Sequence, residues 1–276
     1  MNPKLTQKIA KSLLCGAVLL TSVVLFFIIF YILYHGLSNV NWNFLTGNVE
    51  DLGKKGGIFP TIVSTIYLTA LSVLIAAPLG IGTALYLTCY TEENLFTKIV
   101  RFGTDCLAAI PSIIFGLFGF MLFVIYLRLS WSILSGALTL ASMMLPTIIR
   151  TTEEAIRAVP SSYMDVNYAL GGTKLQGIVK IILPKALPGI LTGVILSMGR
   201  AVSETAALIF TAGMSLRVPV SMFASGRSMA VHFYSLAREG ISLTNAFATA
   251  SVLMITVLII NIVSYLIMHL FLRKYI

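Results

Sequence analysis

The chain has 276 residues, of which 58% are hydrophobic and 11% are charged, and its formal net charge is +9. A soluble globular domain carries about 25% charged residues. This composition therefore excludes a protein that folds around one core in water, and it indicates lipid as the solvent of much of the chain. Nucleic-acid binding is also excluded, because no basic stripe with stacking aromatics lies on a soluble segment.

Six charge-poor windows along the chain are long enough to cross a bilayer, whose core of roughly 30 Å takes about 20 helical residues. Without water to satisfy the backbone, only helices or closed barrels can span, and the windows lack the alternation of barrel strands. The sequence therefore predicts an all-α, polytopic membrane protein with six transmembrane helices. The expected spans are 12–34, 56–91, 106–127, 129–149, 186–216, which Arg200 and Glu204 interrupt, and 241–272.

The expected organisation is an N-terminal tail with the first span at 1–35, an extracytoplasmic loop at 36–59 and a core of five spans at 60–276. The apolar run of the first span is longer than that of a signal peptide, and no cleavage site follows it, so we expect a retained helix. With the N-terminus inside, twelve Lys and Arg residues lie in inner segments and six in outer ones. This bias predicts cytoplasmic N- and C-termini.

Prolines and glycines punctuate the spans. Pro78, Pro111, Pro146 and Pro188 are expected to kink helices in a way that neighbouring helices accommodate. The spacing Gly189-x-x-x-Gly193 permits close contact between helices, although such spacings are common in membrane proteins.

A polar loop at 151–185 separates the fourth and fifth spans. Pro160 is expected to end one helix, Ser162 and Asp165 fit a capping box for the next, and Gly171-Gly172 fits its end. Thr173 then caps another helix that enters the membrane near Leu183 and Pro184. The loop is interpreted either as a docking site for a partner or as an amphipathic hairpin on the bilayer surface.

The chain contains no G-x-x-x-x-G-K-[ST] phosphate-binding loop, and Gly171-Gly172-Thr173-Lys174 is too short to be one. We therefore expect that it binds no nucleotide itself, and that ATP would have to bind a partner if transport is active. No catalytic or metal-ligand spacing is evident, so no catalytic residue and no metal site is predicted.

The charges inside the fifth span point to a polar path. An arginine at a bilayer centre costs roughly 2.5–3.5 kcal/mol on insertion scales. Arg200 and Glu204 are expected to share one helix face, with Ser197 and Thr211 extending a polar stripe. One interpretation is a salt bridge that locks two helices. The other is an anion site, in which the planar guanidinium of Arg200 matches phosphate oxygens and Glu204 holds it when the path is empty.

Arg150, at the inner end of the fourth span, is interpreted either as a positively charged anchor or as part of the path. Two other classes of function remain as alternatives. An intramembrane enzyme would use Glu204 with His232 or His269, and a passive channel would conduct without ATP.

Motifs over 57–213 resemble the permease subunits of phosphate ABC importers, the PstA type. The most specific are Ile181-x-Leu183-Pro184-x-Ala186-Leu187-Pro188-Gly189-Ile190 and Gly199-Arg200-Ala201-x-x-Glu204-Thr205-Ala206. Others are Gly57-Ile58-x-Pro60, Pro78-Leu79-Gly80-Ile81-Gly82, Ile110-Pro111-Ser112-Ile113-Ile114-Phe115-Gly116-Leu117-Phe118-Gly119, Leu145-Pro146-Thr147-Ile148-Ile149-Arg150-Thr151-Thr152-Glu153-Glu154 and Leu170-Gly171-x-Thr173-Lys174.

The resemblance implies an ABC importer type I permease fold in a bacterial cytoplasmic (inner) membrane, surrounded by membrane lipid. It implies a second permease subunit PstC, two copies of the ATPase PstB, which would carry ATP and Mg²⁺, and the extracytoplasmic phosphate-binding protein PstS. Arg150 and Arg200 match family arginines associated with phosphate passage, and Glu204 matches the neighbouring glutamate. The implied ATPase-coupling residues are Asp165, Val166, Asn167, Gly171, Gly172, Thr173, Leu183 and Pro184.

The chain departs from this family at three places. Asp165-Val166-Asn167 stands where the family has Glu-Ala-Ala, Ser203 stands where glycine is usual, and Ala207 stands where proline is usual. The function implied is a permease subunit of an ATP-driven phosphate importer, which forms half of the translocation path. The alternative is a permease for sulfate, molybdate or tungstate.

Overall fold

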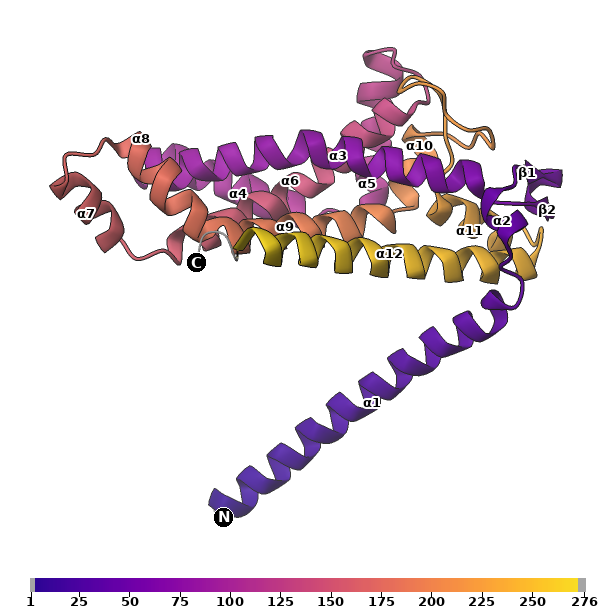
Figure 1. Ribbon diagram of the computed structural model, residues 1–276, viewed down its shortest axis with the longest axis horizontal. Helices are drawn as coiled ribbons and strands as arrows, with labels where there is room; N and C mark the ends of the chain where they lie inside the picture. The colour runs from indigo at the N-terminus through magenta and orange to yellow at the C-terminus, as the bar shows by residue number, and fades with distance from the viewer. Residues whose placement is uncertain (1–2, 273–276) are drawn as a thin grey trace.

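The computed structural model of the chain describes residues 3–272 and consists mainly of long helices (Figure 1). Five of them are long and apolar enough to cross a membrane, and the number becomes six if one sharply bent helix pair is a single span. This confirms the predicted all-α class. Arg273 and Lys274, which contributed to the predicted orientation, lie outside the described residues. The spanning helices are α1 (Pro3–Leu37), α3 (Phe59–Leu85), α6 (Ile133–Arg157), α9 (Leu183–Val202) and α12 (Leu243–Leu272).

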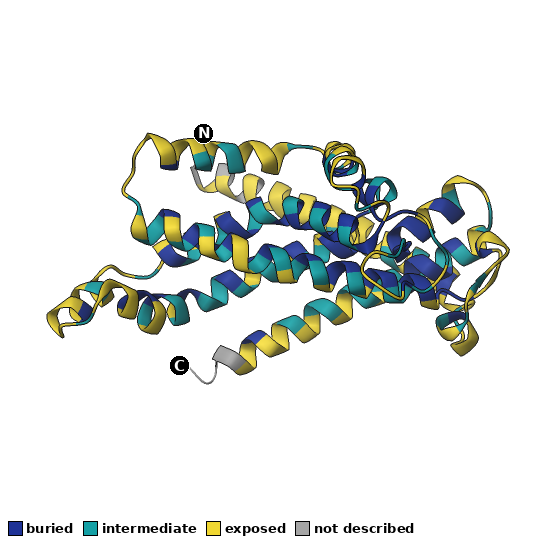
Figure 2. Ribbon diagram, turned by 90° about the horizontal axis from the view of Figure 1, so that it is seen from above, coloured by how far each residue is buried: buried dark blue, intermediate teal, exposed yellow. Residues whose placement is uncertain are grey.

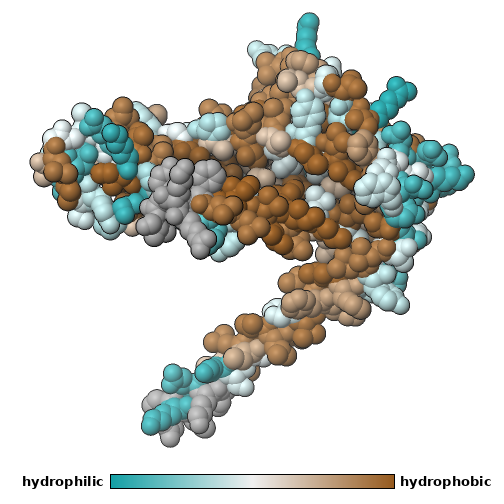
Figure 3. Space-filling model, viewed as in Figure 1, coloured by the Kyte–Doolittle hydropathy of each residue, from teal (hydrophilic) through white to brown (hydrophobic). Residues whose placement is uncertain are grey.

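The core of the bundle is formed by α3, α6 and α9, whose facing sides are buried while their outer sides are exposed (Figure 2). Small residues allow the close approach, since Gly80 of α3 packs against Ile148 of α6 and Gly193 of α9 packs directly against Thr151. The predicted close contact at Gly189 and Gly193 is thus confirmed. The exposed surface of the bundle and of α1 is largely apolar, with hydrophilic residues gathered at the ends (Figure 3), as expected for a protein in lipid.

The third predicted span, 106–127, is not a continuous helix. Helix α4 (Leu95–Ala109) ends before Pro111, and α5 (Ser112–Gly119) with the π-helical segment η3 (Phe120–Tyr126) follows at an angle of 105°. Ile110 is extended, with φ −70° and ψ 131°, because the residue before a proline avoids helical geometry. An apolar cavity of about 440 Å³ lies inside this bend, between α4, α5 and α6.

The fifth predicted span, 186–216, is displaced along the chain. The helix begins earlier, through α8 (Lys174–Gly177) and the π-helical segment η4 (Ile178–Ile182), and it ends at Val202. After a break at 203–205 comes the short helix α10 (Ala206–Thr211). The Glu204 carboxylate accepts a hydrogen bond from the Ala207 N–H at 3.2 Å, and thereby satisfies a free donor at the start of α10.

The end of the bundle that carries α11 (Met229–Arg238) is closed by short elements. Helix α2 (Trp42–Thr46) leads into a two-stranded antiparallel hairpin of β1 (Val49–Glu50) and β2 (Lys55–Gly56), with a 3₁₀ turn, Asp51–Gly53, at its tip. The first helix, α1, packs against α12 through its last two turns, where Gly36 faces Phe247 and the Ile32 carbonyl accepts a hydrogen bond from Ser251, and its earlier turns diverge from the bundle (Figure 1).

Candidate functional site

Ser197, Arg200 and Glu204 line one small cavity, as the sequence predicted for residues of a polar stripe. Its opposite wall is formed by α6, through Leu140, Met143, Met144 and Thr147. The cavity holds about 10 Å³, which is about the space of a single water molecule. It is therefore too small for an oxyanion in this structure. The Arg200 side chain also has an exposed face on the outside of α9.

The expected pairing of Arg200 with Glu204 is wrong for this structure. Both residues are described, and no oxygen of Glu204 lies within 4.0 Å of the Arg200 guanidinium. The reason is the end of α9 at Val202, which removes the shared helix face on which the prediction depended. Glu204 is buried and bonded to α10, so its carboxylate stabilises a helix start beside the cavity.

Thr211 does not join this group. Its hydroxyl donates to the Ala207 carbonyl at 2.8 Å, and its side chain packs beside Gly119 of α5. It lies at the far end of α10, where its carbonyl accepts a hydrogen bond from the Ser132 N–H. The predicted stripe therefore includes Ser197, Arg200 and Glu204 but not Thr211.

Arg200 lies in the last turn of α9, but this turn is far from the ends of the neighbouring helix α12. The neighbouring Gly199 faces the Asn261 amide of α12, a residue far from both ends of that helix. Ser197, one turn earlier, donates its hydroxyl to the Gly193 carbonyl and adds no free donor. The guanidinium of Arg200 is thus the main polar group on this part of α9.

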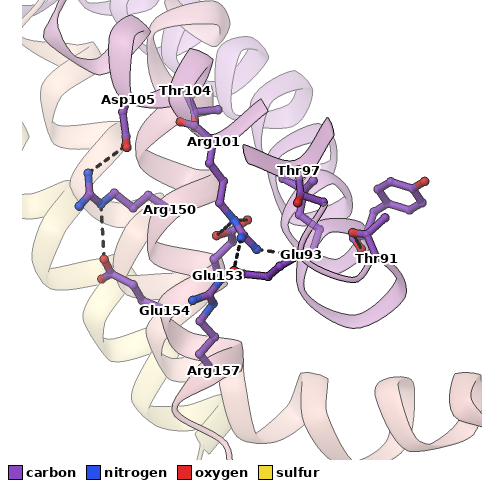
Figure 4. A network of polar contacts seen from close by, with 12 residues as sticks. Thr91, Glu93, Thr97, Arg101, Thr104, Asp105, Arg150, Glu153, Glu154 and Arg157 are labelled. Atoms are coloured by element: carbon purple, nitrogen blue, oxygen red, sulfur yellow. Dashed lines mark hydrogen bonds and ion pairs between the residues drawn. The ribbon is translucent and has the colours of Figure 1, made fainter. Parts of the chain in front are cut away.

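Arg150 lies in a separate cavity of about 350 Å³ and does not meet Arg200. Its guanidinium forms ion pairs with Asp105 at 3.0 Å and with Glu154 at 3.5 Å (Figure 4). The Arg150 side chain is 66% exposed, so these contacts leave donors available. It can serve as an anion-binding group without breaking any buried contact.

A charged network that the sequence analysis missed surrounds this cavity. Arg101 of α4 contacts Glu153 at 3.2 Å and Glu93 at 3.0 Å, and Arg157 contacts Glu93 at 3.8 Å (Figure 4). Glu153 is buried, and Arg101 is its partner. The sequence did contain a sign of this network. The spacing of Arg150, Glu153, Glu154 and Arg157 places four charges on one face of α6.

The loop that follows α6 is more compact than expected. Helix α6 continues to Arg157, so only 158–173 connects it to α8, and α7 (Ser162–Ala169) lies within this connection. The predicted helix end before Pro160 is confirmed. The predicted capping box at Ser162 and Asp165 is wrong, because Ser161 precedes α7 and forms no side-chain cap.

The turn after α7 has the geometry that its glycines predicted. Gly171 has φ +77°, and the N–H groups of Gly171 and Gly172 donate to the Tyr168 and Asn167 carbonyls, a Schellman ending. Thr173 caps α8 in a capping box with Gln176, as expected for the Thr173 cap. The Asn167 side chain donates to the Thr173 carbonyl at 3.1 Å and so joins α7 to α8.

The remaining predicted docking residues divide into a buried base and an exposed tip. Leu183 packs with Ile156 and Ile182 at the start of α9, and Pro184 follows the π-helical segment η4 in the first turn of α9. Asp165 and Val166 are exposed on α7. The exposed apolar side chains at this tip, which projects from one end of the bundle (Figure 1), are Tyr163, Val166, Tyr168, Leu170 and Leu175.

Within the described part of the chain, no three His, Cys, Asp or Glu side chains are placed to hold a metal ion. Among the predicted site residues, Arg150 and Arg200 carry the guanidinium groups that could hold a ligand. Their chemistry is anion binding, since each presents several N–H donors in a plane.

Comparison with known sequences places this geometry in context. Residues 76–276 match the family described as "Binding-protein-dependent transport system inner membrane component". The probable ABC transporter permease protein YqgI of Bacillus subtilis is 32% identical, over 95% of each chain. The phosphate transport system permease protein PstA of Pasteurella multocida is 31% identical over 94% of this chain and 93% of its own length. PstA 1 of Mycobacterium tuberculosis is 36% identical over 61% of this chain and 55% of its own length.

Solved structures share the fold at low sequence identity. A chain of the bacterial alginate ABC transporter, in complex with its alginate pentasaccharide-bound periplasmic protein, superposes with a TM-score of 0.67 at 16% identity, over 94% of each chain. A chain of the inward-facing MetNI methionine ABC transporter gives a TM-score of 0.64 at 18% identity, over 78% of this chain and 95% of that one.

Proposed function

Because the chain belongs to the family of binding-protein-dependent transport system inner membrane components, we propose that it forms half of the membrane path of a phosphate importer. As a member of this family it is a permease subunit of an ABC importer in the inner membrane, and it is not an enzyme. Relatives named as phosphate transport system permease proteins support phosphate as the transported ion.

The exposed guanidinium of Arg200 is the observation that carries this function. A helix face that meets lipid is apolar, since a charged group in hydrocarbon is costly. Arg200 is exposed on α9 at a level far from the ends of α12. The face of α9 that carries it therefore meets a polar path or a partner, and an arginine there favours an anion as the ion that passes.

In the present conformation the path is closed between α9 and α6, because the cavity beside Arg200 holds about 10 Å³. We infer that transport requires α9 to move relative to α6. The break at 203–205 allows such movement, since it separates α9 from α10, which is packed against α5 and α6. Phosphate would then pass from Arg200 toward Arg150, whose donors are accessible at the end of the bundle near α7.

The movement is supplied by partners. Importers of this family work with ATPase subunits and with an extracytoplasmic binding protein, and we propose a PstB dimer, PstS and the second permease subunit PstC for these roles. In this proposal ATP and Mg²⁺ bind PstB and not this chain. In this proposal the exposed apolar tip of α7 is the docking surface, and α7 and both termini lie in the cytoplasm. The rigid turns at Gly171 and Thr173 would transmit the motion of PstB to α6 and α9.

The function is tested by uptake of labelled phosphate at micromolar concentration in cells that lack the chain, with sulfate and molybdate measured alongside. Selective loss of phosphate uptake, restored by the native chain, is the expected result. Unchanged phosphate uptake with loss of sulfate or molybdate uptake would instead assign a different oxyanion to the same architecture. ATP-independent conduction by the purified chain would identify a channel and overturn the proposal.

A further inference from the structure

A buried arginine precedes α11, at the end of the bundle opposite α7 (Figure 1). Arg227 is 8% exposed. One of its terminal nitrogens lies 3.4 Å from Nδ1 of His232, and its Nε, which is buried, has no hydrogen-bond partner among the described residues. An arginine is rarely buried without a charged or hydrogen-bonded partner, because removing the charge from water is costly.

The groups around Arg227 do not compensate its charge. Within residues 3–272 no carboxylate lies within 4.0 Å of it, and Glu239, the acid whose field favours its charged form, is at the other end of α11. Burial, followed by the charge of Arg227, lowers the pKa of His232 to about 4, so this imidazole is neutral near pH 7 and adds no negative charge.

The backbone adds a second positive contribution at the same place. Ser228 is the N-cap of α11, and the positive end of a helix dipole favours an anion and disfavours a cation. Arg227 crosses this first turn to reach His232, the fourth residue of the helix. A cation and a helix N-terminus that lie together are each destabilised by the other unless an anion lies between them.

We propose that Arg227 and the first turn of α11 form an oxyanion-binding site, distinct from Arg200 and Arg150, which receives the transported ion at the end of the bundle opposite the docking loop. The identity of the ion as phosphate rests on the proposed function, whereas the site itself does not. Two N–H groups of this turn are already used, since Met229 donates to Thr65 Oγ1 and Val231 donates to Ser228 Oγ. The guanidinium of Arg227 and the N–H of Ala230 are the donors left for a tetrahedral oxyanion.

A free ion fits this site better than a carboxylate side chain of a partner protein. The hairpin covers the position, since Gly53 packs on His232 and Leu236. The Asn245 amide holds this hairpin by donating to the Gly53 carbonyl at 2.7 Å and to the Lys54 carbonyl at 3.0 Å. A small ion needs only a slight opening to pass, whereas a side chain must bring its own backbone close to a buried group.

The test uses the purified full-length chain and inorganic phosphate as the probe. We expect phosphate to raise the midpoint of thermal unfolding, because a ligand that binds the folded state stabilises it. Arg227→Met keeps the side-chain volume and removes the buried charge, so it should fold at least as stably as the native chain without phosphate. In this variant the apparent Kd for phosphate should rise by about tenfold or more.

Two matched variants separate this site from general effects of charge. Arg238→Gln removes an exposed arginine of the same helix and should leave phosphate binding unchanged. Glu239→Gln removes the acid whose charge acts on Arg227. The affinity of this variant for phosphate should be equal to or higher than that of the native chain. Phosphate stabilisation that persists in Arg227→Met, or that is absent from the native chain, would overturn the proposal. Stabilisation that appears only on adding the binding protein would overturn it in favour of a partner carboxylate.

Uptake by the intact assembly distinguishes failure of this site from failure of the proposed function. One outcome is that cells need the chain for phosphate uptake, but Arg227→Met changes neither phosphate binding nor the phosphate concentration at which uptake is half-maximal. In that case the proposed site is wrong and the proposed function stands. If sulfate rather than phosphate stabilises the native chain in an Arg227-dependent way, the site stands and the proposed ion is wrong.

Discussion

Arg150, Arg200 and Arg227 differ in how the surroundings compensate their charges. Arg150 has two carboxylate partners and remains largely exposed. Arg200 is exposed without a carboxylate partner among the described residues, and Arg227 is buried with only a neutral imidazole beside it. The cost of an uncompensated charge in an apolar region makes Arg200 and Arg227 the residues with most to gain from an anion.

We expect Arg200→Met to lower phosphate uptake by about tenfold or more, because it removes a charged, bidentate donor. Arg200→Lys should retain part of the activity, since the charge remains and the planar fork is lost. The measurement is initial uptake rate, normalised to the amount of chain in the membrane. Arg217→Gln, at an exposed arginine of the connection before α11, is the control. Equal uptake by Arg200→Met would remove Arg200 from the path.

His232 predicts a pH dependence of stability. Its pKa is about 4 in the folded protein and 6.5 when unperturbed, so the unfolded chain binds its proton more strongly. The contribution, roughly 3 kcal/mol, is complete above pH 6.5 and is lost as the pH falls toward 4. Thermal unfolding in phosphate-free buffer between pH 7 and 4 measures it. His232→Gln should flatten this part of the profile, and an unchanged slope would show that His232 does not titrate as described.

At the scale of elements, the connection between α4 and α6 is electrostatic and lies at the end of the bundle near α7. The last two turns of α6 place four charges opposite Arg101 and Asp105 of α4. The same turns lead through Pro160 into α7. Movement of α7 would therefore act directly on the contact between α4 and α6.

The Arg101–Glu153 pair should couple the two helices by about 1–3 kcal/mol in a double-mutant cycle, because Glu153 is buried and loses its partner when Arg101 is removed. Unfolding free energies of Arg101→Met, Glu153→Met and the double variant provide the measurement. The Lys55–Asp51 pair, with side chains 74% and 59% exposed, is the matched control and should give less than about 1 kcal/mol. Equal coupling in both pairs would contradict the role given to burial.

At the scale of the whole molecule, the two ends of the bundle differ in kind. One end carries α7 with exposed apolar side chains, and the other carries the hairpin packed over α11 (Figures 1 and 3). Exposed apolar residues on an element beyond the spans are typical of an interaction site. The long exposed surface of α1 and the outer side of α12 have a different cause, since lipid covers such surfaces.

Leu170→Asp tests the docking role of α7. Leu170 is 82% exposed, and burying a leucine in an interface contributes about 1.5–3 kcal/mol, so retention of the ATPase should fall by about tenfold or more. Copurification of the ATPase with the tagged chain, and the ATP hydrolysis it supports, are the measurements. Leu52→Asp, at an exposed leucine of the opposite end, is the control. Normal retention of the ATPase by Leu170→Asp would favour the other interpretation of the loop at 151–185, in which it lies as an amphipathic hairpin on the bilayer surface.

The apolar windows, the helical class, the turn at Gly171 and the absence of a nucleotide-binding loop followed from the sequence alone. The physical reason is that a span in lipid must satisfy its own backbone, so spans and turns are local properties of the chain. The ends of helices were harder to predict from the sequence. Glu204 illustrates the reason, because a side chain that can cap a helix competes locally with continuation of the helix.

Only the tertiary structure decided which charges meet. Arg101 and Glu153 are 52 residues apart in the chain, and Arg150 and Asp105 are 45 apart, so no local pattern joins them. The same holds for the separation of Arg150 from Arg200 and for the burial of Arg227 beside His232. These features depend on how α4, α6, α9 and α11 pack, because the energy of a charge is set by what surrounds it in space.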